Sequence, residues 1–290
     1  MTNKFEQLPA RPQAEISQLS YDRWLTPDGE IVLSFYRLDE GYLLRFPERA
    51  DFLVTEKTNS VVCTPAPEIC PQIITELYFN QVLPLLLNSR GELVLHGSAV
   101  LMKGSAVAFI GQSGRGKSTL AATLARDGFP FLTDDGLLLT RKHGAYIAHP
   151  NRPYVRLRND SEKGVFNDQF VAPVFASDQK NRVISGISLP FADDACPLGE
   201  LYILGSGECE NVVIEPLDPA SAFCAYMGHS FILDVEDKAL LKGHFGRLAE
   251  LAESALCFTL DYPRRYEFLP EVSEAIILNS SLVRQNHELR

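Results

Sequence analysis

The sequence predicts an α/β fold, and three observations support this prediction. The apolar run AVAFI (106–110) reads as a strand, and a glycine-rich stretch and a helix-like segment, KSTLAATLARDG (117–128), follow it. Short runs rich in β-branched and aromatic residues, such as EIVLSFYRL and GYLLRF, fill the region before it. An amphipathic segment at 237–255 is typical of a helix packed on a sheet.

Composition narrows the classes of function. The chain has 290 residues, 46% of them apolar and 22% charged, and a net charge of −10. This acidity disfavours a general nucleic-acid binder. The first residues, MTNKFEQLPARPQAE, lack the apolar core of a secretory signal, and no run approaches the length of a membrane span. We therefore expect a cytoplasmic protein with neither nucleic acid nor membrane as a partner.

The six cysteines show no C-x-x-C pair, which disfavours a zinc site or a disulfide framework. Cysteine is among the residue types most often found inside proteins. We expect buried free thiols.

The first part of the chain predicts a β-rich accessory domain over residues 1–89. Residues 1–16 are polar and contain two prolines, so we expect disorder there. Strand-like runs between Trp24 and Val62, with turns at PDG and DEG, predict a small antiparallel sheet. The proline-rich TPAPEICP (64–71) is a connector, and 72–88 is a helix that Pro84 should kink or break.

The second domain is expected over residues 90–290. The runs ELVLHGSAVLM and AVAFI form a hairpin through Lys103 and Gly104. Residues 128–140 form a buried strand that contains two aspartates, and 160–195 give no clear pattern. The runs PLGELYILG (197–205) and NVVIEPL (211–217) look like paired strands. Asp218 and Pro219 begin a helix, 237–255 form another, and a last helix follows Pro270.

The glycine-rich stretch after AVAFI reads GQSGRGKS, the pattern G-x-x-x-x-G-K-[ST] of a loop that cradles nucleotide phosphates. Its glycines allow positive φ, so the backbone N–H groups can surround an anion at the start of a helix. Lysine adds charge for the β- and γ-phosphates, and the serine hydroxyl can bind Mg²⁺. The sequence therefore predicts that ATP and Mg²⁺ are bound by Gly111, Gln112, Ser113, Gly114, Arg115, Gly116, Lys117, Ser118 and Thr119.

A carboxylate must accompany such a loop, and FLTDD (131–135) supplies two. Adjacent residues on a strand point to opposite faces. One of Asp134 and Asp135 could then hold the metal while the other faces a substrate hydroxyl. Either residue could instead be a turn former before Gly136.

The motifs LHGSAV (95–100), GQSGRGKST (111–119) and LTDD (132–135) together resemble the HPr serine kinase/phosphorylase family. They are similar, more distantly, to phosphoenolpyruvate carboxykinase. The resemblance implies a P-loop core of this type after the small β-rich domain. Carried over by position, it implies that Lys117 binds the phosphates, that Ser118 and Asp135 are metal ligands, and that Asp134 takes the proton from an acceptor serine. His96 would lie beside the phosphates, whereas the residues alone are equally compatible with a core histidine.

The stretch RVISGISLP (182–190) departs from the glutamate and R-G-x-G of HPr kinases. The chain looks closer to the small HPr-kinase-like proteins, some of which phosphorylate serine on ribosomal peptide precursors. The expected reaction is transfer of the ATP γ-phosphoryl group to a serine or other hydroxyl of a protein or peptide. The alternative is an ATP-binding sensor without transfer. An ABC-type ATPase is excluded because no L-S-G-G-Q motif occurs.

Three arginines close to this region have open roles. Arg156 and Arg158 alternate with apolar residues, so they share one strand face, either as a phosphate clamp or as a solvated face. Arg152 lies between two prolines and is no better determined. The acceptor, any reverse reaction and homo-oligomer formation are left open by the sequence.

Overall fold

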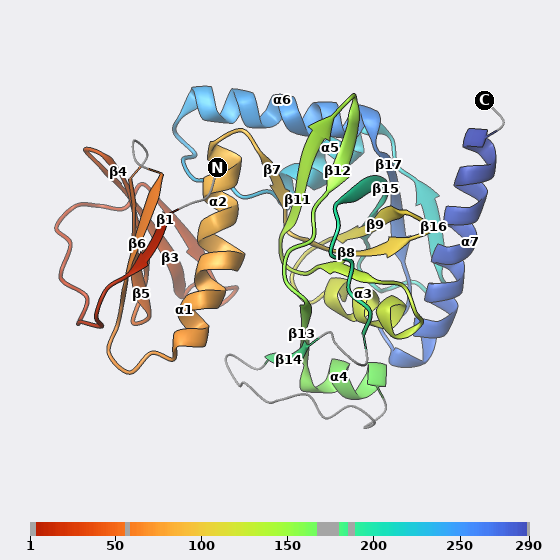
Figure 1. Cartoon of the computed structure of the whole chain (residues 1–290), viewed down its shortest axis with the longest axis horizontal. Coiled ribbons are helices and arrows are strands. Elements are labelled where there is room, and N and C mark those ends of the chain that lie inside the picture. The colour runs from red at the N-terminus through yellow and green to blue at the C-terminus, as the bar shows by residue number, and fades with distance from the viewer. Residues whose placement is uncertain (1–3, 56–58, 167–179, 185–188, 289–290) are drawn as a thin grey trace. The chain divides into compact units, whose positions relative to one another are not determined.

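The computed structural model describes residues 4–55, 59–166, 180–184 and 189–288. The chain divides into two compact units (Figure 1). The first comprises Met1–Leu86 together with Asp234–Asp237, and the second comprises Leu87–Leu233 and Lys238–Arg290. The short segment 234–237 is therefore distant in sequence from the rest of its unit, which no sequence pattern indicated.

The first unit is built on a six-stranded sheet with the order β1-β6-β5-β4-β3-β2. The buried side chains of Phe35, Leu44 and Phe52 come from its central strands. The antiparallel sheet predicted between Trp24 and Val62 is confirmed, because β2 to β6 pair consecutively in that sense. The strands are β1 (Lys4–Gln7), β2 (Asp22–Leu25), β3 (Ile31–Leu38), β4 (Gly41–Phe46), β5 (Ala50–Thr55) and β6 (Ser60–Pro65).

The prediction of disorder over residues 1–16 was wrong for the described part. Strand β1 pairs in parallel with β6, and the Gln13 amide donates to Phe46 O at 3.1 Å and to Asp51 Oδ1 at 2.8 Å. All four β1 side chains are exposed. The segment is held by backbone hydrogen bonds to a strand more than fifty residues away, so its own polar composition could not reveal it.

The predicted kinked helix forms as α1 (Pro71–Leu77), a π-helical turn (Tyr78–Val82) and α2 (Leu83–Ser89). Leu83 N–H donates to Tyr78 O, five residues back. Pro84 cannot donate a backbone hydrogen bond, and its ring crowds the carbonyl four residues earlier. The wider π turn just before Pro84 accommodates that defect without ending the helix.

The second unit contains a nine-stranded mixed sheet with the main order β10-β8-β9-β15-β12-β11-β7. Strand β15 lies parallel to both β9 and β17, and the other pairs are antiparallel. The predicted β8–β9 hairpin is confirmed, with positive φ at Lys103 and Gly104. The strands are β7 (Leu93–Leu95), β8 (Gly97–Met102), β9 (Ser105–Ile110), β10 (Phe131–Thr133), β11 (Leu137–Lys142), β12 (Ala145–Ala148), β15 (Cys196–Leu204), β16 (Val213–Pro216) and β17 (Leu256–Asp261).

The prediction that 197–205 and 211–217 pair with each other was wrong. Strand β17 lies between β15 and β16 and pairs with both. A hairpin was expected because the two runs are close in sequence, whereas the strand that separates them comes about forty residues later.

Helices pack on both faces of this sheet (Figure 1). Phe109 of β9 faces a cluster that includes α3 and α7, whereas Ala108 and Ile110 face a cluster that includes α5 and α6. The alternation of a buried strand thus provides two apolar faces. The helices are α3 (Lys117–Arg126), α4 (Asn159–Phe166), α5 (Pro219–Gly228), α6 (Lys238–Ser254) and α7 (Leu269–Glu288).

The predicted start of α5 is confirmed and α6 lies within the predicted 237–255, whereas α7 begins at Leu269 and includes Pro270 instead of following it. Asp218 Oδ1 caps α5 by accepting from Ala220 N and Ser221 N, both at 3.0 Å. Residues 160–195, left unassigned, contain most of α4 and also β14 (Lys180–Ile184), which pairs with β13 (Tyr154–Arg158). Residues 167–179 and 185–188, including part of RVISGISLP, lie outside the described residues.

All six cysteines are free. The expectation that they are buried holds for Cys63, Cys196 and Cys257, while the other three are exposed or half-buried. Within the described residues, no helix has both the length and the apolar character needed to cross a membrane.

Candidate functional site

The glycine loop, residues Gly111–Gly116, connects the end of β9 to the start of α3 (Figure 1). Gly114 and Gly116 have φ of 82° and 92°, the left-handed conformation expected for a phosphate-binding turn. Gly111 has no positive φ, contrary to the prediction; a Cβ there would lie 3.1 Å from Leu204 Cβ. Glycine is therefore favoured at this position because the backbone of residue 111 lies close to β15.

Lys117 and Ser118 begin α3 and lie directly after this loop. The buried Lys117 ammonium donates to the carbonyl oxygens of Gly111 at 2.8 Å and Gln112 at 3.2 Å. Ser118 Oγ donates to Asp134 Oδ1 at 2.8 Å. The lysine charge, the serine hydroxyl and the helix N-terminus are thus gathered within one turn, where the helix dipole also favours an anion.

Asp134 and Asp135 follow β10 rather than continuing it, so the expected alternation across a strand was wrong. The backbone turns here: Asp135 has φ 63°, and Gly136 N donates to Asp134 O at 2.8 Å. Asp134 Oδ1 accepts from Ser98 Oγ at 2.5 Å as well as from Ser118, and its Oδ2 accepts from Arg156 N at 3.0 Å. The carboxylate of Asp134 is thus fixed from three sides.

Asp135 forms an ion pair with Arg156, whose Nη1 lies 3.2 Å from Asp135 Oδ2. Burial, followed by the neighbouring charge of Asp135, raises the pKa of Asp134, and its hydrogen bonds from Ser98, Arg156 and Ser118 oppose that rise. Two adjacent carboxylates that are 9% and 7% exposed repel each other in a poorly solvated place. A cation bound between the loop and this pair would relieve that cost.

The donors at this position fit Mg²⁺. A serine hydroxyl and carboxylate oxygens are hard ligands, and Mg²⁺ is usually held by one or two carboxylates together with substrate phosphates. In the described parts of the chain, no group of three or more histidine, cysteine or acidic side chains forms a complete cage for a metal. The residues therefore suit a metal that arrives with a nucleotide.

A cavity of about 240 Å³ opens beside the loop. Ser113, Gly114, Gly116, Lys117, Ser118 and Thr119 line one part of it, and Asp135, Arg156 and Arg158 are also among the lining residues. Both strand arginines noted in the sequence therefore face the cavity, and Arg152 is not among its lining residues. The Arg115 guanidinium instead donates to Ser206 O, and Gln112 is exposed outside the lining.

Sequence reasoning missed the residues that follow β17. Tyr262, Arg264, Arg265 and Tyr266 all line the cavity. The Arg264 guanidinium stacks 3.9 Å from the Tyr262 ring centroid and donates to Gly205 O at 2.8 Å. Because β9, β15 and β17 are parallel, the residues after each strand meet at one edge of the sheet. The sequence DYPRRYEF, which follows an apolar strand, carries these basic and aromatic residues. Placing them at the cavity requires knowing that β17 lies beside β15 in the sheet.

Two histidines lie at this site. His96 lines the cavity, and its backbone N–H donates to the backbone carbonyl oxygen of His229 at 2.7 Å. The pKa of His229 is lowered by burial and then by the nearby Lys117 charge. No local sequence pattern points to His229, since it comes from the end of α5, more than one hundred residues after the loop.

No family model matches the chain, and no curated protein matches its sequence. One solved structure with a partial likeness is that of the Hpr(Ser) kinase/phosphatase from Coxiella burnetii, at 13% identity. The match covers 68% of this chain and 96% of that one, with a TM-score of 0.32. A likeness at this level carries no conclusion about activity.

Proposed function

We propose that this chain is an ATP- and Mg²⁺-dependent phosphotransferase that transfers the γ-phosphoryl group to a hydroxyl, with serine of a protein or peptide as the acceptor class. The observation that carries the proposal is the contact of Ser118, directly after the glycine loop, with the buried Asp134–Asp135 pair. A loop alone would suit any nucleotide-binding module. A paired carboxylate beside the phosphate position supplies what transfer to a hydroxyl needs.

Nucleotide binding would use the loop amides and the Lys117 ammonium for the β- and γ-phosphates. Ser118 and one aspartate would hold Mg²⁺, which neutralises charge on the phosphoryl oxygens during transfer. Arg156 and Arg158, on the cavity wall, are placed to bind anionic oxygens. The acceptor class rests on the sequence motifs, and the net charge of −10 disfavours nucleic acid.

The geometry favours exchanging the two aspartate roles that the family resemblance implied. Both Asp134 oxygens already accept hydrogen bonds, one of them from the proposed metal ligand Ser118. Asp135 lines the cavity where an acceptor would enter, with its Oδ2 paired to Arg156 at 3.2 Å. The raised pKa of Asp134 would suit a base, but a base must first reach the proton that it removes. We therefore assign the metal to Asp134 and the base to Asp135.

Paired Asp→Asn variants test this assignment. Asp135→Asn should lower transfer about 10²- to 10⁴-fold, the usual contribution of a general base, and leave MgATP affinity near wild type. Asp134→Asn should raise the Mg²⁺ concentration needed for half-maximal transfer. Transfer is measured with γ-labelled ATP and serine-containing acceptors in a lysate, and affinity by calorimetry with Lys117→Ala as the binding-deficient control.

Each alternative has its own outcome in this experiment. Exchanged phenotypes would restore the roles that the family resemblance implied, Asp134 as base and Asp135 as ligand. MgATP binding without any transfer that depends on either aspartate would identify a nucleotide sensor. A wild-type protein that binds no nucleotide in calorimetry would refute the phosphate-loop interpretation as a whole.

A further inference from the structure

Strands β13 and β14 form a two-stranded ribbon with four basic positions in register. Arg156 lies opposite Arg182, and Arg158 lies opposite Lys180. Residues that face each other across two strands, or that are two apart on one strand, lie on the same face. The residues that alternate with the two arginines of β13 are buried in the hydrophobic core. The four basic positions, here named the basic face, therefore lie on the side of the ribbon away from that core.

The basic face suits a negatively charged ligand. Like charges directly opposite each other destabilise a pair of strands. Asp135 balances one of these charges, since its carboxylate pairs with Arg156 at 3.2 Å. Arg158 is exposed, and among the described residues it has no ion-pair partner. A bound carboxylate would give this guanidinium a partner and reduce the repulsion along the ribbon.

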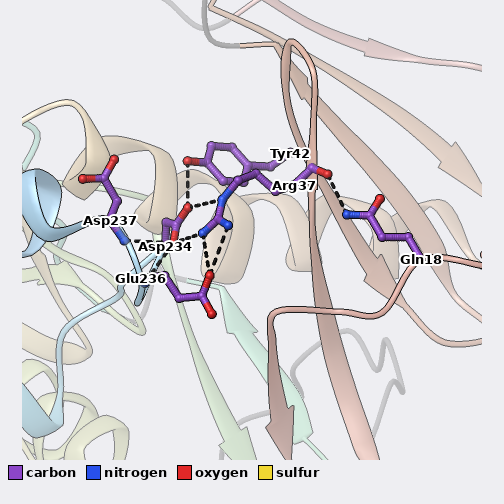
Figure 2. Close-up of polar contacts among 6 residues, drawn as sticks. All are labelled: Gln18, Arg37, Tyr42, Asp234, Glu236 and Asp237. Carbon is purple, nitrogen blue, oxygen red and sulfur yellow. Dashed lines mark hydrogen bonds and ion pairs between the residues drawn. The ribbon is translucent and has the colours of Figure 1, made fainter.

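Arg37, near the end of strand β3, shows the contrasting case of an exposed arginine that the chain itself satisfies (Figure 2). Within the first unit its guanidinium donates to Asp234 at 2.7 and 2.9 Å and to Glu236 at 3.1 Å. Such charge-assisted pairs fix an arginine in place. The described part of the chain supplies no equivalent carboxylate at Arg158, which leaves that position to a ligand.

The basic face leads outward from the buried carboxylate pair of the candidate site. The backbone N–H of Arg156 donates to Asp134 Oδ2 at 3.0 Å, and its side chain reaches Asp135. Arg158 lies two residues further, about 7 Å along the strand, and lines the same cavity. Since Arg156 is half-buried and Arg158 is exposed, the path from Asp135 along β13 runs toward solvent.

The phosphates of a nucleotide have other partners for their charge. Under the proposed function they contact the loop amides, the Lys117 ammonium and a metal held by Ser118 and Asp134. The exposed end of the basic face is therefore available to the second substrate. The whole chain has a net charge of −10 and repels an acidic partner at a distance, so local positive charge decides where such a partner binds.

We propose that the basic face binds an acidic segment of the acceptor, so that the acceptor class is a serine with aspartate or glutamate close to it in sequence. An extended peptide covers about 7 Å in two residues, the separation of Arg156 and Arg158 along β13. The most favourable acid is therefore two residues from the serine. This inference rests on the proposed function, but binding of the acidic segment is measurable without transfer.

The test uses two capped synthetic peptides and the full-length protein. Each peptide contains one serine in an otherwise uncharged sequence, with Asp (acidic peptide) or Lys (basic peptide) two residues away on both sides. Binding is measured by fluorescence anisotropy of the labelled peptides in the presence of MgADP, and transfer with γ-labelled ATP. Wild type should bind the acidic peptide about tenfold more tightly than the basic peptide and show the same preference in kcat/KM.

Arg158→Glu should abolish or reverse this preference, and Arg158→Gln should reduce it. Both should leave MgADP affinity, measured by calorimetry, near that of wild type. Lys142→Glu is the matched control because it makes the same change of charge at an exposed strand end. Lys142 is not among the described residues that line the cavity, so this variant should keep the wild-type preference.

Three results would overturn the proposal: equal or no binding of the two peptides by wild type, an unchanged preference in Arg158→Glu, or loss of MgADP binding in Arg158→Glu. The last result would assign Arg158 to the nucleotide. Preferential binding of the acidic peptide that depends on Arg158, without transfer to any serine-containing acceptor, would refute the proposed function and leave the basic face as a binding site for acidic segments.

Discussion

His244 gives a prediction about acid stability that can be worked out quantitatively. It lies within α6 and is 4% exposed, and within the described residues neither ring nitrogen has a hydrogen-bond partner. Burial, followed by the positive charge of Arg247, lowers the pKa of His244 to about 4. The folded protein therefore holds this imidazole neutral, whereas the unfolded chain protonates it near pH 6.5.

The sign and size of the effect follow from linkage. Between pH 6.5 and 4 the unfolded state binds the proton and the folded state does not, so stability falls as the pH falls. The lowering of the His244 pKa from 6.5 to about 4 corresponds to a total loss of about 3 kcal/mol in the free energy of unfolding at low pH. About 2 kcal/mol of this is already lost at pH 5. For a chain of 290 residues, the pH 5 loss equals a Tm decrease of about 3 °C.

The assay is thermal unfolding at pH 8 and pH 5 for wild type and His244→Leu, with His143→Asn as an exposed control. Leucine cannot titrate, so the Tm of the variant should fall about 3 °C less than that of wild type between the two pH values. His143 lies in an exposed turn at φ 52°, which asparagine tolerates, so the control should follow wild type. If Tm decreases equally in wild type and His244→Leu between pH 8 and pH 5, the neutral buried histidine is not the cause of acid sensitivity.

Three further predictions concern the surroundings of the site. Ser98→Ala removes a donor that favours the charged form of Asp134, so the acid limb of transfer should move to higher pH in a pH–rate profile; an unmoved limb would contradict it. Gly116→Ala combines φ 92° with a Cβ that would lie 3.0 Å from Tyr262 OH, so calorimetry should show weaker MgATP binding, and wild-type affinity would refute the strain argument. Asn88→Ala should cost about 2–3 kcal/mol in denaturant unfolding, because buried backbone groups lose their partners; a cost below about 0.5 kcal/mol would refute this.

Local features of the fold could be predicted because their causes are local. The hairpin at Lys103, the cap at Asp218 and the helix that begins with Lys117 each depend on residues within a few positions. Strand β1 and the place of β17 depend on pairing with distant segments, which short-range patterns do not record. This is why element types were predicted better than sheet order.

The candidate site divides in the same way. The glycine loop is a local motif, and its neighbour FLTDD was recognisable as an acid-bearing strand end. The face that each aspartate presents was not predictable, because strand alternation ends at Thr133 and the chain turns. Arg264 was missed because only the strand order places it at the cavity. His229 was missed because it lies near Lys117 only through the position of the end of α5.

The buried carboxylate pair links these observations into one physical argument. Asp134 and Asp135 are almost fully buried side by side, an arrangement that raises the pKa of Asp134 and opposes folding unless it is compensated. Ser98 of β8, Ser118 of α3 and the backbone of Arg156 in β13 supply compensating donors. A protein that needed only to hold a nucleotide would gain nothing from the second carboxylate. Keeping both beside Ser118 is understandable if a metal and an acceptor hydroxyl are handled at the same place, which is why the paired Asp→Asn variants decide the function.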